Sequence, residues 1–264
     1  MSTLTYAITD SATMLRRSLR HMQRYPSLTV LVAGMPVVFM LLFVYVFGGT
    51  LGAGIGGAAG GRTFYVNYLV PGILLVAVAA AAQGTAVSVA MDMTEGIIAR
   101  FRTMAIARVS VLTGHVLGSM VKTAFGLVVT IGVALLIGFR PTAGPLAWLA
   151  AIGLLAAFTF ALTWLTVALG LAAKTVESAS NTPMFLMLLP FLSSAFVPTD
   201  SMPPGLRAFA EYQPFTPVTE TLRGLFFGTP IGSDGIVSLA WCAGIALVSF
   251  LWARKLFSRD PVQA

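Results

Sequence analysis

Few side chains in this 264-residue sequence could catalyse a reaction or bind a nucleotide. A P-loop needs a lysine directly after a glycine, because the loop amides surround the phosphates while the lysine reaches the terminal ones. The three lysines, Lys122, Lys174 and Lys255, each follow a residue other than glycine. The sequence therefore excludes nucleotide binding by a P-loop.

The other reactive side chains form no recognisable catalytic or metal-binding set. Asp92 and Glu95 are close in sequence, but we expect them to flank a helix start rather than face each other across a reaction centre. One cysteine, Cys242, excludes a disulfide within the chain, and with His21 and His115 it offers too few ligands for a metal cluster. We therefore expect no enzyme activity, no catalytic residue, no metal and no cofactor in this chain.

The composition is that of an integral membrane protein. Of all residues, 57% are hydrophobic and only 9% are charged, against roughly 25% charged in soluble domains. A helix needs about 20 predominantly apolar residues to span the hydrocarbon, and six segments qualify, of which the fifth is the shortest and contains Pro190. We expect one all-α polytopic domain, 1–264, with spans at 27–47, 67–91, 116–139, 146–172, 183–197 and 236–253.

Lys122 is the ionisable side chain that lies inside a predicted span, the third. Secondary transporters and channels usually keep such groups deep in the bilayer. The favoured interpretation is that the lysine stem extends back to the cytoplasmic headgroups, and the alternative is a role in moving protons or substrate. Because the spans otherwise hold almost no charge, we expect an apolar or amphipathic transported compound.

The segment 1–26 differs in character from the spans. Leu15, Leu19 and Met22 recur at helical spacing beside several arginines, which is typical of an amphipathic helix in the membrane interface. Pro26 separates this helix from the first span. A cleaved signal peptide is the alternative, and it is disfavoured because the apolar run is about twice as long as a usual h-region.

The basic residues indicate the orientation in the membrane. One side of the predicted spans, with both terminal segments, holds eleven of the sixteen Lys and Arg residues, and the other side holds four. By the positive-inside rule, both termini are cytoplasmic. The net charge of +7 is thereby explained by topology and anionic lipid rather than by nucleic acid. The eleven are Arg16, Arg17, Arg20, Arg24, Arg100, Arg102, Arg108, Lys174, Arg254, Lys255 and Arg259; the four are Arg62, Arg140, Arg207 and Arg223.

Two external connections have an unusual composition. The segment 48–63 is half glycine, which favours a flexible linker. The segment 198–235 is too long and too apolar for a plain loop, and it predicts a helical hairpin that re-enters or lies on the outer leaflet. One of its helices would begin at Pro217, with Thr216 as N-cap, and would stop at Gly228.

Within that helix, Glu220 and Arg223 are three residues apart, so their side chains can pair. Such a pair would lie at the outer mouth of the protein, or else be a solvated pair on an external helix. The apolar face of the helix would consist of Val218, Leu222, Leu225 and Phe226.

The cytoplasmic connection 92–115 predicts a short amphipathic helix. Ile97, Phe101 and Met104 form an apolar stripe at helical spacing, and three arginines surround it. An apolar ridge with an arginine border suits docking into an acidic groove of a soluble partner. Anchoring on anionic lipid explains the pattern equally well. The arginines are Arg100, Arg102 and Arg108.

Three motifs, in order along the chain, resemble one protein family. The stretch 95–108 (EGIIARFRTMAIAR) is similar to the cytoplasmic motif of the ABC type-2 permeases, especially the daunorubicin-resistance-type membrane subunits of actinobacteria. The stretches 193–204 (SSAFVPTDSMPP) and 213–224 (QPFTPVTETLRG) resemble the same family. Ala105 departs from the proline that relatives often carry, which affects a helix end but not the class.

The resemblance implies a half-transporter with the type V exporter fold, located in the cell membrane. Two six-span subunits, identical or homologous, would pair, and two copies of a separately encoded ATPase would hold the ATP and Mg. The exported compound would be hydrophobic or amphipathic, such as an antibiotic-like natural product or a lipid. The resemblance assigns ATPase coupling to Glu95, Gly96, Arg100, Phe101, Arg102 and Arg108, and an outer gate to Pro217, Glu220 and Arg223.

Two other functions stay open at this point. A polysaccharide or lipid-conjugate exporter of the same fold would show more aromatic residues for sugar stacking, and a secondary transporter without ATP is disfavoured by the nearly charge-free spans. Met184, Met187 and Phe191 of the fifth span are candidates for a substrate path, because methionine adapts to many shapes. The alternative is that they face lipid.

The orientation can be tested with single cysteines in a chain whose Cys242 has been replaced. Gly57→Cys should react with an impermeant thiol reagent added outside intact cells, and Ser110→Cys should not, because only the first lies on the arginine-poor side. The measurement is labelling before and after permeabilisation. Labelling of the Ser110→Cys protein from outside would demonstrate the opposite orientation.

Overall fold

The computed structural model describes residues 26–57, 60–94 and 108–257, and every regular element in these ranges is a helix. The predicted all-α class is therefore confirmed for the described part of the chain. The predicted interfacial segment up to residue 25 and residues 95–107 of the predicted coupling region lie outside the described residues.

Five described helices are long and apolar enough to cross a membrane. They correspond to five of the six predicted spans, and each begins one to eight residues earlier than predicted. In the first, α2 continues through a π-helical turn at Phe43–Phe47 into α3. The helices are α2 (Pro26–Leu42) with α3 (Gly48–Gly56), α4 (Arg62–Thr94), α6 (Arg108–Leu136), α7 (Pro145–Ala172) and α12 (Asp234–Phe257).

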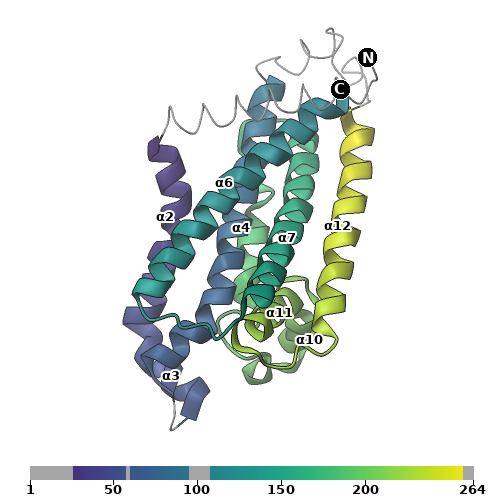
Figure 1. Cartoon of the computed structure of the whole chain (residues 1–264). Coiled ribbons are helices and arrows are strands. Elements are labelled where there is room, and N and C mark those ends of the chain that lie inside the picture. Colours follow the sequence, from purple (N-terminus) through teal and green to yellow (C-terminus); the bar gives the residue numbers. More distant parts are fainter. Residues whose placement is uncertain (1–25, 58–59, 95–107, 258–264) are drawn as a thin grey trace.

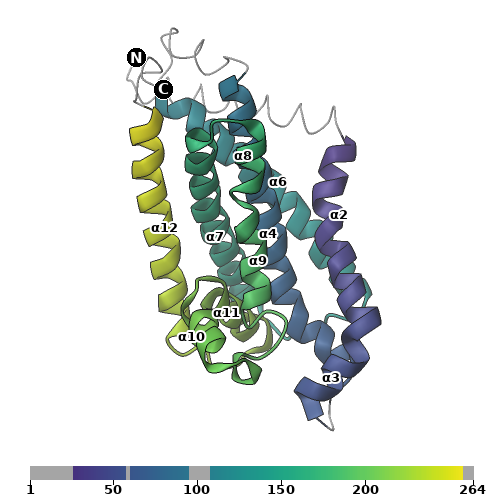
Figure 2. The same ribbon diagram turned by 180° about the vertical axis from the view of Figure 1, so that it is seen from behind.

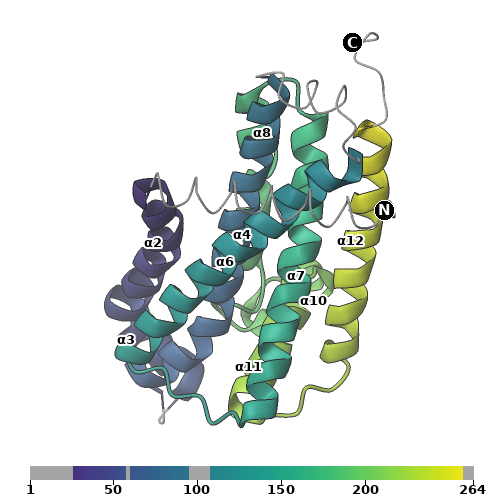
Figure 3. The ribbon, with the colours of Figure 1, turned by 45° about the horizontal axis from the view of Figure 1, so that its top comes forward.

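The helix α4 is the centre of the bundle. Its side chains from Val70 to Ala79 are all buried, because α2, α6, α7 and the short α8 (Val176–Asn181) pack around it. In Figures 1 and 3, α2 and α12 lie at opposite flanks of the bundle. The flanking helices keep apolar residues such as Val38 and Val248 exposed, as is expected for faces that contact lipid or another subunit.

The predicted fifth span, 183–197, is wrong as a continuous helix. The chain instead forms α8, then α9 (Met184–Leu188) and a 3-10 turn at Leu189–Leu192, followed by turns up to residue 197. Figure 2 shows α8 and α9 following each other along the bundle toward α10 and α11. Pro183 and Pro190 explain the breaks, because proline has no N–H for the helical hydrogen bond and its ring clashes with the preceding turn.

The glycine-rich segment 48–63 is also different from the prediction, since its first nine residues form α3 rather than a flexible linker. The helix packs against the start of α4, and a side chain at Gly52 would meet the backbone of Gly61, with the Gly61 carbonyl carbon 2.7 Å away. Gly57, at φ +55°, follows the helix end in a positive-φ conformation that residues other than glycine disfavour. Gly52 therefore allows a close approach to the Gly61 backbone, whereas Gly57 allows a turn.

The described helix ends divide the basic residues as the sequence predicts. The ends of α4, α7 and α12 lie at one end of the bundle, while α3, α10 and α11 lie at the other (Figure 1). Lys174, Arg254 and Lys255 belong to the first end by their position in the chain, and Arg62 and Arg140 belong to the second. The assignment of the first end to the cytoplasm stays a prediction.

The contact between α4 and the broken fifth segment predicts a strict limit on side-chain size at Gly72. A Cβ there would overlap the methyl group of Ala195 and lie 2.9 Å from its Cα. Gly72→Ala should therefore lower the free energy of unfolding by about 1–3 kcal/mol through overpacking. Thermal unfolding in detergent measures the effect.

Gly84→Ala is the matched control, because it lies on the same helix with no heavy atom within 4 Å of its would-be Cβ. Alanine stabilises a helix by about 0.5–1 kcal/mol relative to glycine, so this variant should be as stable as the wild type or more so. Equal unfolding midpoints for the two variants would contradict the close contact.

Candidate functional site

The candidate site lies at the end of the bundle where α10 (Pro204–Tyr212) and α11 (Phe215–Phe227) pack together (Figure 1). The helix α11 begins two residues before the predicted start at Pro217. Its early start is supported by Gln213, whose Oε1 accepts a hydrogen bond from the Phe215 amide at 3.1 Å. Pro217 is tolerated because the first turn of a helix does not need its N–H.

The predicted N-cap role of Thr216 is wrong, and the residue has a different function. Its Oγ1 accepts a hydrogen bond from the Ser194 amide at 3.2 Å and donates one to the Ala210 carbonyl at 2.5 Å. Thr216 thus joins α11 to α10 and to the turn after the fifth segment. The predicted stop is confirmed, because Gly228 ends the helix at φ +70°.

The apolar face of α11 is buried inside the bundle. Val218, Leu222 and Phe226 have no exposed surface, which confirms the predicted face for these three, and Leu225 is half-buried. The ring of Phe215 packs edge-on against Phe158 of α7, with centroids 5.1 Å apart. The helix is therefore an internal part of the bundle and does not lie loosely on its end.

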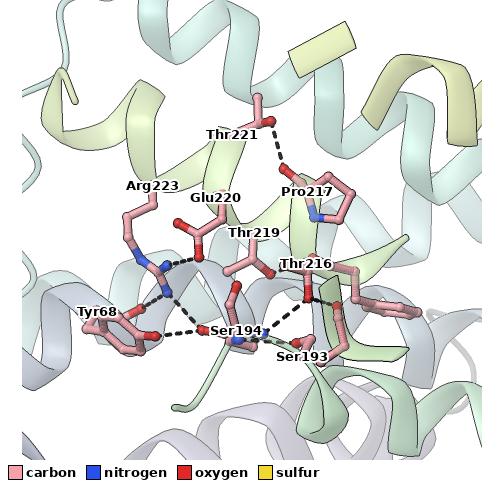
Figure 4. Close-up of polar contacts among 12 residues, drawn as sticks. Tyr68, Ser193, Ser194, Thr216, Pro217, Thr219, Glu220, Thr221 and Arg223 are labelled. Atoms are coloured by element: carbon pink, nitrogen blue, oxygen red, sulfur yellow. Dashed lines mark hydrogen bonds and ion pairs between the residues drawn. The ribbon is translucent and has the colours of Figure 1, made fainter. Parts of the chain in front are cut away.

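The Arg223 side chain makes the largest number of polar contacts in the site (Figure 4). Its Nη1 donates to Glu220 Oε1 at 2.6 Å, which confirms the predicted pairing of these two residues. Its Nη2 donates to the carbonyl of Tyr68 on α4 at 3.1 Å and to the carbonyl of Ser194 at 3.2 Å. The guanidinium also lies 3.9 Å from the centre of the Tyr68 ring, a favourable cation–π arrangement.

Tyr68 and Ser194 are the members of this network that the sequence did not reveal. The Tyr68 hydroxyl donates to the same Ser194 carbonyl at 2.9 Å, so that one oxygen accepts from two side chains. Ser194 lies in a predicted family motif, but its partners are 126 and 29 residues away. No short-range spacing could have indicated them.

The exposure of the two charges separates their roles. The Arg223 side chain is 15% exposed, whereas Glu220 is 36% exposed. A largely buried guanidinium needs partners for several of its donors, and two carbonyls, a carboxylate and a ring supply them here. Glu220 reaches solvent, so it neutralises the arginine without depending on it.

The turn 193–197 is held from within the segment as well. Ser193 Oγ donates to the Pro190 carbonyl at 2.5 Å and accepts from the Ala195 amide at 3.1 Å. Gln213 Nε2 donates to the Leu189 carbonyl at 3.3 Å, which ties the same segment to the connection between α10 and α11. The broken fifth segment is therefore pinned to the α10–α11 pair on several backbone groups.

Outside the spanning helices, α10 carries an exposed charge cluster. Arg207 pairs with Asp200 at 2.6 Å and with Glu211 at 2.7 Å. The hydrogen bond to Glu211 and the charge of Asp200 raise the pKa of Arg207 above its ordinary value. Because the cluster is solvated, it contributes little to stability.

The three predicted substrate-path residues do not share one environment. Met184 is 55% exposed on the outside of α9, whereas Met187 is half-buried. Phe191 stacks on Phe196, with centroids 4.6 Å apart, and meets Phe39 of α2 edge-on at 5.8 Å. Phe191 therefore joins the broken segment to the first span. Of the three residues, Met184 is the one on the exposed surface of the bundle.

At the other end of the bundle, the predicted coupling residues are mostly outside the described chain. Five of the six fall in the range 95–107, outside the described residues: Glu95, Gly96, Arg100, Phe101 and Arg102. Arg108 is the first residue of α6. The described residues on either side are joined, since His115 Nε2 lies 3.1 Å from Asp92 Oδ2. Lys122 is half-buried on α6. Among the described residues, no group of three or more His, Cys, Asp or Glu could hold a metal.

Comparison with known proteins places this geometry in context. The family model described as ABC-2 type transporter matches residues 10–227. The daunorubicin resistance ABC transporter permease protein DrrB1 of Streptomyces coeruleorubidus is 30% identical over 244 residues, which cover 92% of this chain and 83% of that protein. The probable doxorubicin resistance ABC transporter permease protein DrrC of Mycobacterium tuberculosis is 28% identical over 180 residues, 66% of this chain and 64% of that protein.

The network predicts that the stability of this end depends on the shape of Arg223 and not only on its charge. Arg223→Ala should lower the free energy of unfolding by about 2–3 kcal/mol, because charged hydrogen bonds to buried carbonyls are lost. Arg223→Lys should cost nearly as much, since one ammonium cannot reach the carboxylate, both carbonyls and the ring together. Denaturant unfolding in detergent measures both variants.

Glu220→Gln serves as the control for the ion pair alone. It should cost less than about 1 kcal/mol, as partly exposed pairs do. The double variant Glu220→Ala/Arg223→Ala should resemble Arg223→Ala, because the freed Glu220 is exposed enough to be hydrated. Full stability of Arg223→Lys, or a loss in Glu220→Gln as large as in Arg223→Ala, would contradict the role of the carbonyl contacts.

Proposed function

Since the chain belongs to the ABC-2 type transporter family, we propose that it is the membrane-spanning permease subunit of an ATP-driven exporter. The exported compound is hydrophobic or amphipathic, of the drug-like, antibiotic kind. The observation that carries this proposal is the alignment of 92% of the chain with a daunorubicin resistance permease. The energy comes from a separate ATPase, because the sequence has no P-loop.

The character of the spanning helices supports this function over secondary transport. Each of the five contains an 18-residue apolar window with at most two charged residues. Transport coupled to ions usually relies on ionisable groups inside the membrane. A transporter without ATP is therefore less favoured. A polysaccharide exporter is less favoured because the relatives are daunorubicin and doxorubicin resistance permeases.

The partners in this proposal are two copies of the ATPase and a second permease subunit, identical or homologous, in the plasma membrane. Both termini face the cytoplasm, and the coupling region 92–115 docks on the ATPase. In that region Glu95, Gly96 and Phe101 form the contact together with Arg100, Arg102 and Arg108. The end of α4 and the start of α6 lie at the same end of the bundle (Figure 1), which supports a contact surface there.

The α10–α11 end would be the outer gate, with Pro217, Glu220 and Arg223 as its residues. Support comes from the way Arg223 ties α11 to α4 and to the turn after the fifth segment. Met184, Met187 and Phe191 would line the substrate path. The exposed position of Met184 is equally compatible with contact with lipid. ATP-driven closure of the partner would shift the permease between inward-open and outward-open states, provided that the compound binds the two states with different affinity.

The proposal predicts ATPase-dependent export that fails when the coupling region is altered. Cells that contain the permease and its ATPase should accumulate less daunorubicin than cells that contain either protein alone. Arg100→Glu/Arg102→Glu should abolish this difference and reduce co-purification of the ATPase, because each lost charged contact costs about 2 kcal/mol or more. Membrane insertion of the variant should be unchanged.

Lys174→Glu/Arg254→Glu is the matched control, since it reverses the same number of charges on exposed side chains at the same end of the bundle, outside the coupling region. It should export and co-purify as the wild type does. Wild-type co-purification of the ATPase with the Arg100→Glu/Arg102→Glu variant would refute the docking role. Export that survives omission of the ATPase would refute the function.

A further inference from the structure

A polar contact joins the two helices that flank the coupling region. Asp92 lies two residues before the end of α4, and His115 lies in the second turn of α6. Their side chains meet at 3.1 Å, Oδ2 to Nε2, which is a hydrogen-bonding distance. The segment between them in sequence is the one that the proposed function assigns to ATPase contact.

We propose that the Asp92–His115 contact is a transmission clasp, which makes the ends of α4 and α6 move as one when the ATPase acts on the segment between them. The inference rests on the proposed function and adds two positioning residues to it. Without such a tie, force applied to the segment could displace one helix end and leave the other behind. With it, the two ends respond together.

The contact is shielded, which is what a transmitting bond requires. The side chains of Asp92 and His115 are only 11% and 17% exposed. A polar bond at a water-accessible position would exchange readily for bonds to water, whereas a shielded bond gains strength from its low-dielectric surroundings. The Asp92–His115 contact should therefore stay intact when the ATPase moves the coupling region.

The surroundings of the clasp connect it to the rest of the bundle. Val89 of α4, and Leu112 and Val116 of α6, lie within one turn of the pair along their helices and are buried. They belong to an apolar cluster that is separate from the main core and also contains Trp164 of α7 and Phe257 of α12. A displacement of the clasp therefore passes into a packed unit of four helices.

A second polar contact between α4 and α6 offers a close comparison. Thr85 Oγ1 donates to Ser119 Oγ at 2.6 Å, and both residues are buried. This contact lies about two turns deeper along α4 and one turn further along α6 than the clasp. It joins the same helices but lies away from the coupling region. Its removal therefore shows whether any α4–α6 contact supports coupling or only the one beside the coupling region.

The test measures transport and ATP hydrolysis separately in the complete permease–ATPase complex in liposomes, with daunorubicin as the probe. The key variant is Asp92→Leu/His115→Leu, because replacing both partners by apolar groups leaves no unpaired buried carboxylate. We expect daunorubicin transported per ATP hydrolysed to fall about tenfold, a typical size for coupling between sites. In Thr85→Val/Ser119→Ala this ratio should stay at the wild-type value.

Asp92→Asn keeps the test decisive if the double leucine variant does not fold. The amide oxygen can still accept the Nε2 proton, so daunorubicin transported per ATP hydrolysed should stay within about twofold of the wild-type value. In Asp92→Ala, which has no acceptor, this ratio should fall as in the double leucine variant. A wild-type ratio in the folded double leucine variant would overturn the clasp, and so would an equal loss in Asp92→Asn and Asp92→Ala.

The failure of the proposed function has a different signature. In that case the wild-type complex itself would show no ATP-dependent transport of daunorubicin, although the ATPase alone hydrolyses ATP.

One further outcome would overturn the clasp alone. If transport per ATP fell as far in the Thr85→Val/Ser119→Ala variant as in the double leucine variant, any polar contact between α4 and α6 would explain the coupling, and the position of Asp92 and His115 would not matter.

Discussion

The backbone of the broken fifth segment is the part of the molecule that most needs support. A break in a helix frees amide and carbonyl groups, and the hydrocarbon of a bilayer offers them no hydrogen bonds, so such a break persists only where protein groups satisfy them. Five of these groups between Leu189 and Ala195 are met by side chains. The donors and acceptors are Gln213 for Leu189, Ser193 for Pro190 and Ala195, Thr216 for the Ser194 amide, and Arg223 with Tyr68 for the Ser194 carbonyl.

That constraint explains why α10 and α11 lie where they do. Three of the supporting side chains come from the short stretch Gln213 to Arg223, so the helical pair has to remain beside the break. The missing Cβ of Gly72 lets the turn at Ala195 rest directly on α4. This end of the bundle is therefore one polar and steric unit, in which Arg223 binds the backbone of two other segments as well as the Glu220 carboxylate.

The sequence could predict the parts of this fold that depend on local pattern. Long apolar runs predict six spans, five of which correspond to long apolar helices, and the i, i+3 spacing predicts the contact of Glu220 with Arg223, which the structure shows at 2.6 Å. The break at 183–197 was mispredicted because mean apolarity does not register what Pro183 and Pro190 do to a short helix. The tertiary partners of Arg223 could not be predicted, since Tyr68 is 155 residues away.

Glycine shows the same limit in another form. A run of glycines is compatible with flexibility or with close backbone contact, and composition alone cannot distinguish them. In α3 the neighbouring backbone decides the matter, because Gly52 faces Gly61 with no room for a side chain. At Gly52 and Gly60, glycine is thus a packing requirement that is visible only once the chain on either side of residues 58–59 is placed together.

The helix α4 links the two ends of the molecule mechanically. Tyr68 and Asp92 are 24 positions apart on this one helix, which corresponds to roughly 36 Å at 1.5 Å per residue. Surrounded by other helices along most of this length, α4 can tilt or shift as a rod more easily than it can bend, except at Pro71, where its hydrogen-bond ladder lacks a donor. Pro71 lies one turn from the Tyr68 carbonyl that Arg223 holds. A displacement that enters at the Asp92 end is therefore carried along α4 to Pro71, beside the point where α4, α11 and the broken segment are joined. There it either bends the helix at Pro71 or changes the geometry of the Arg223 contacts.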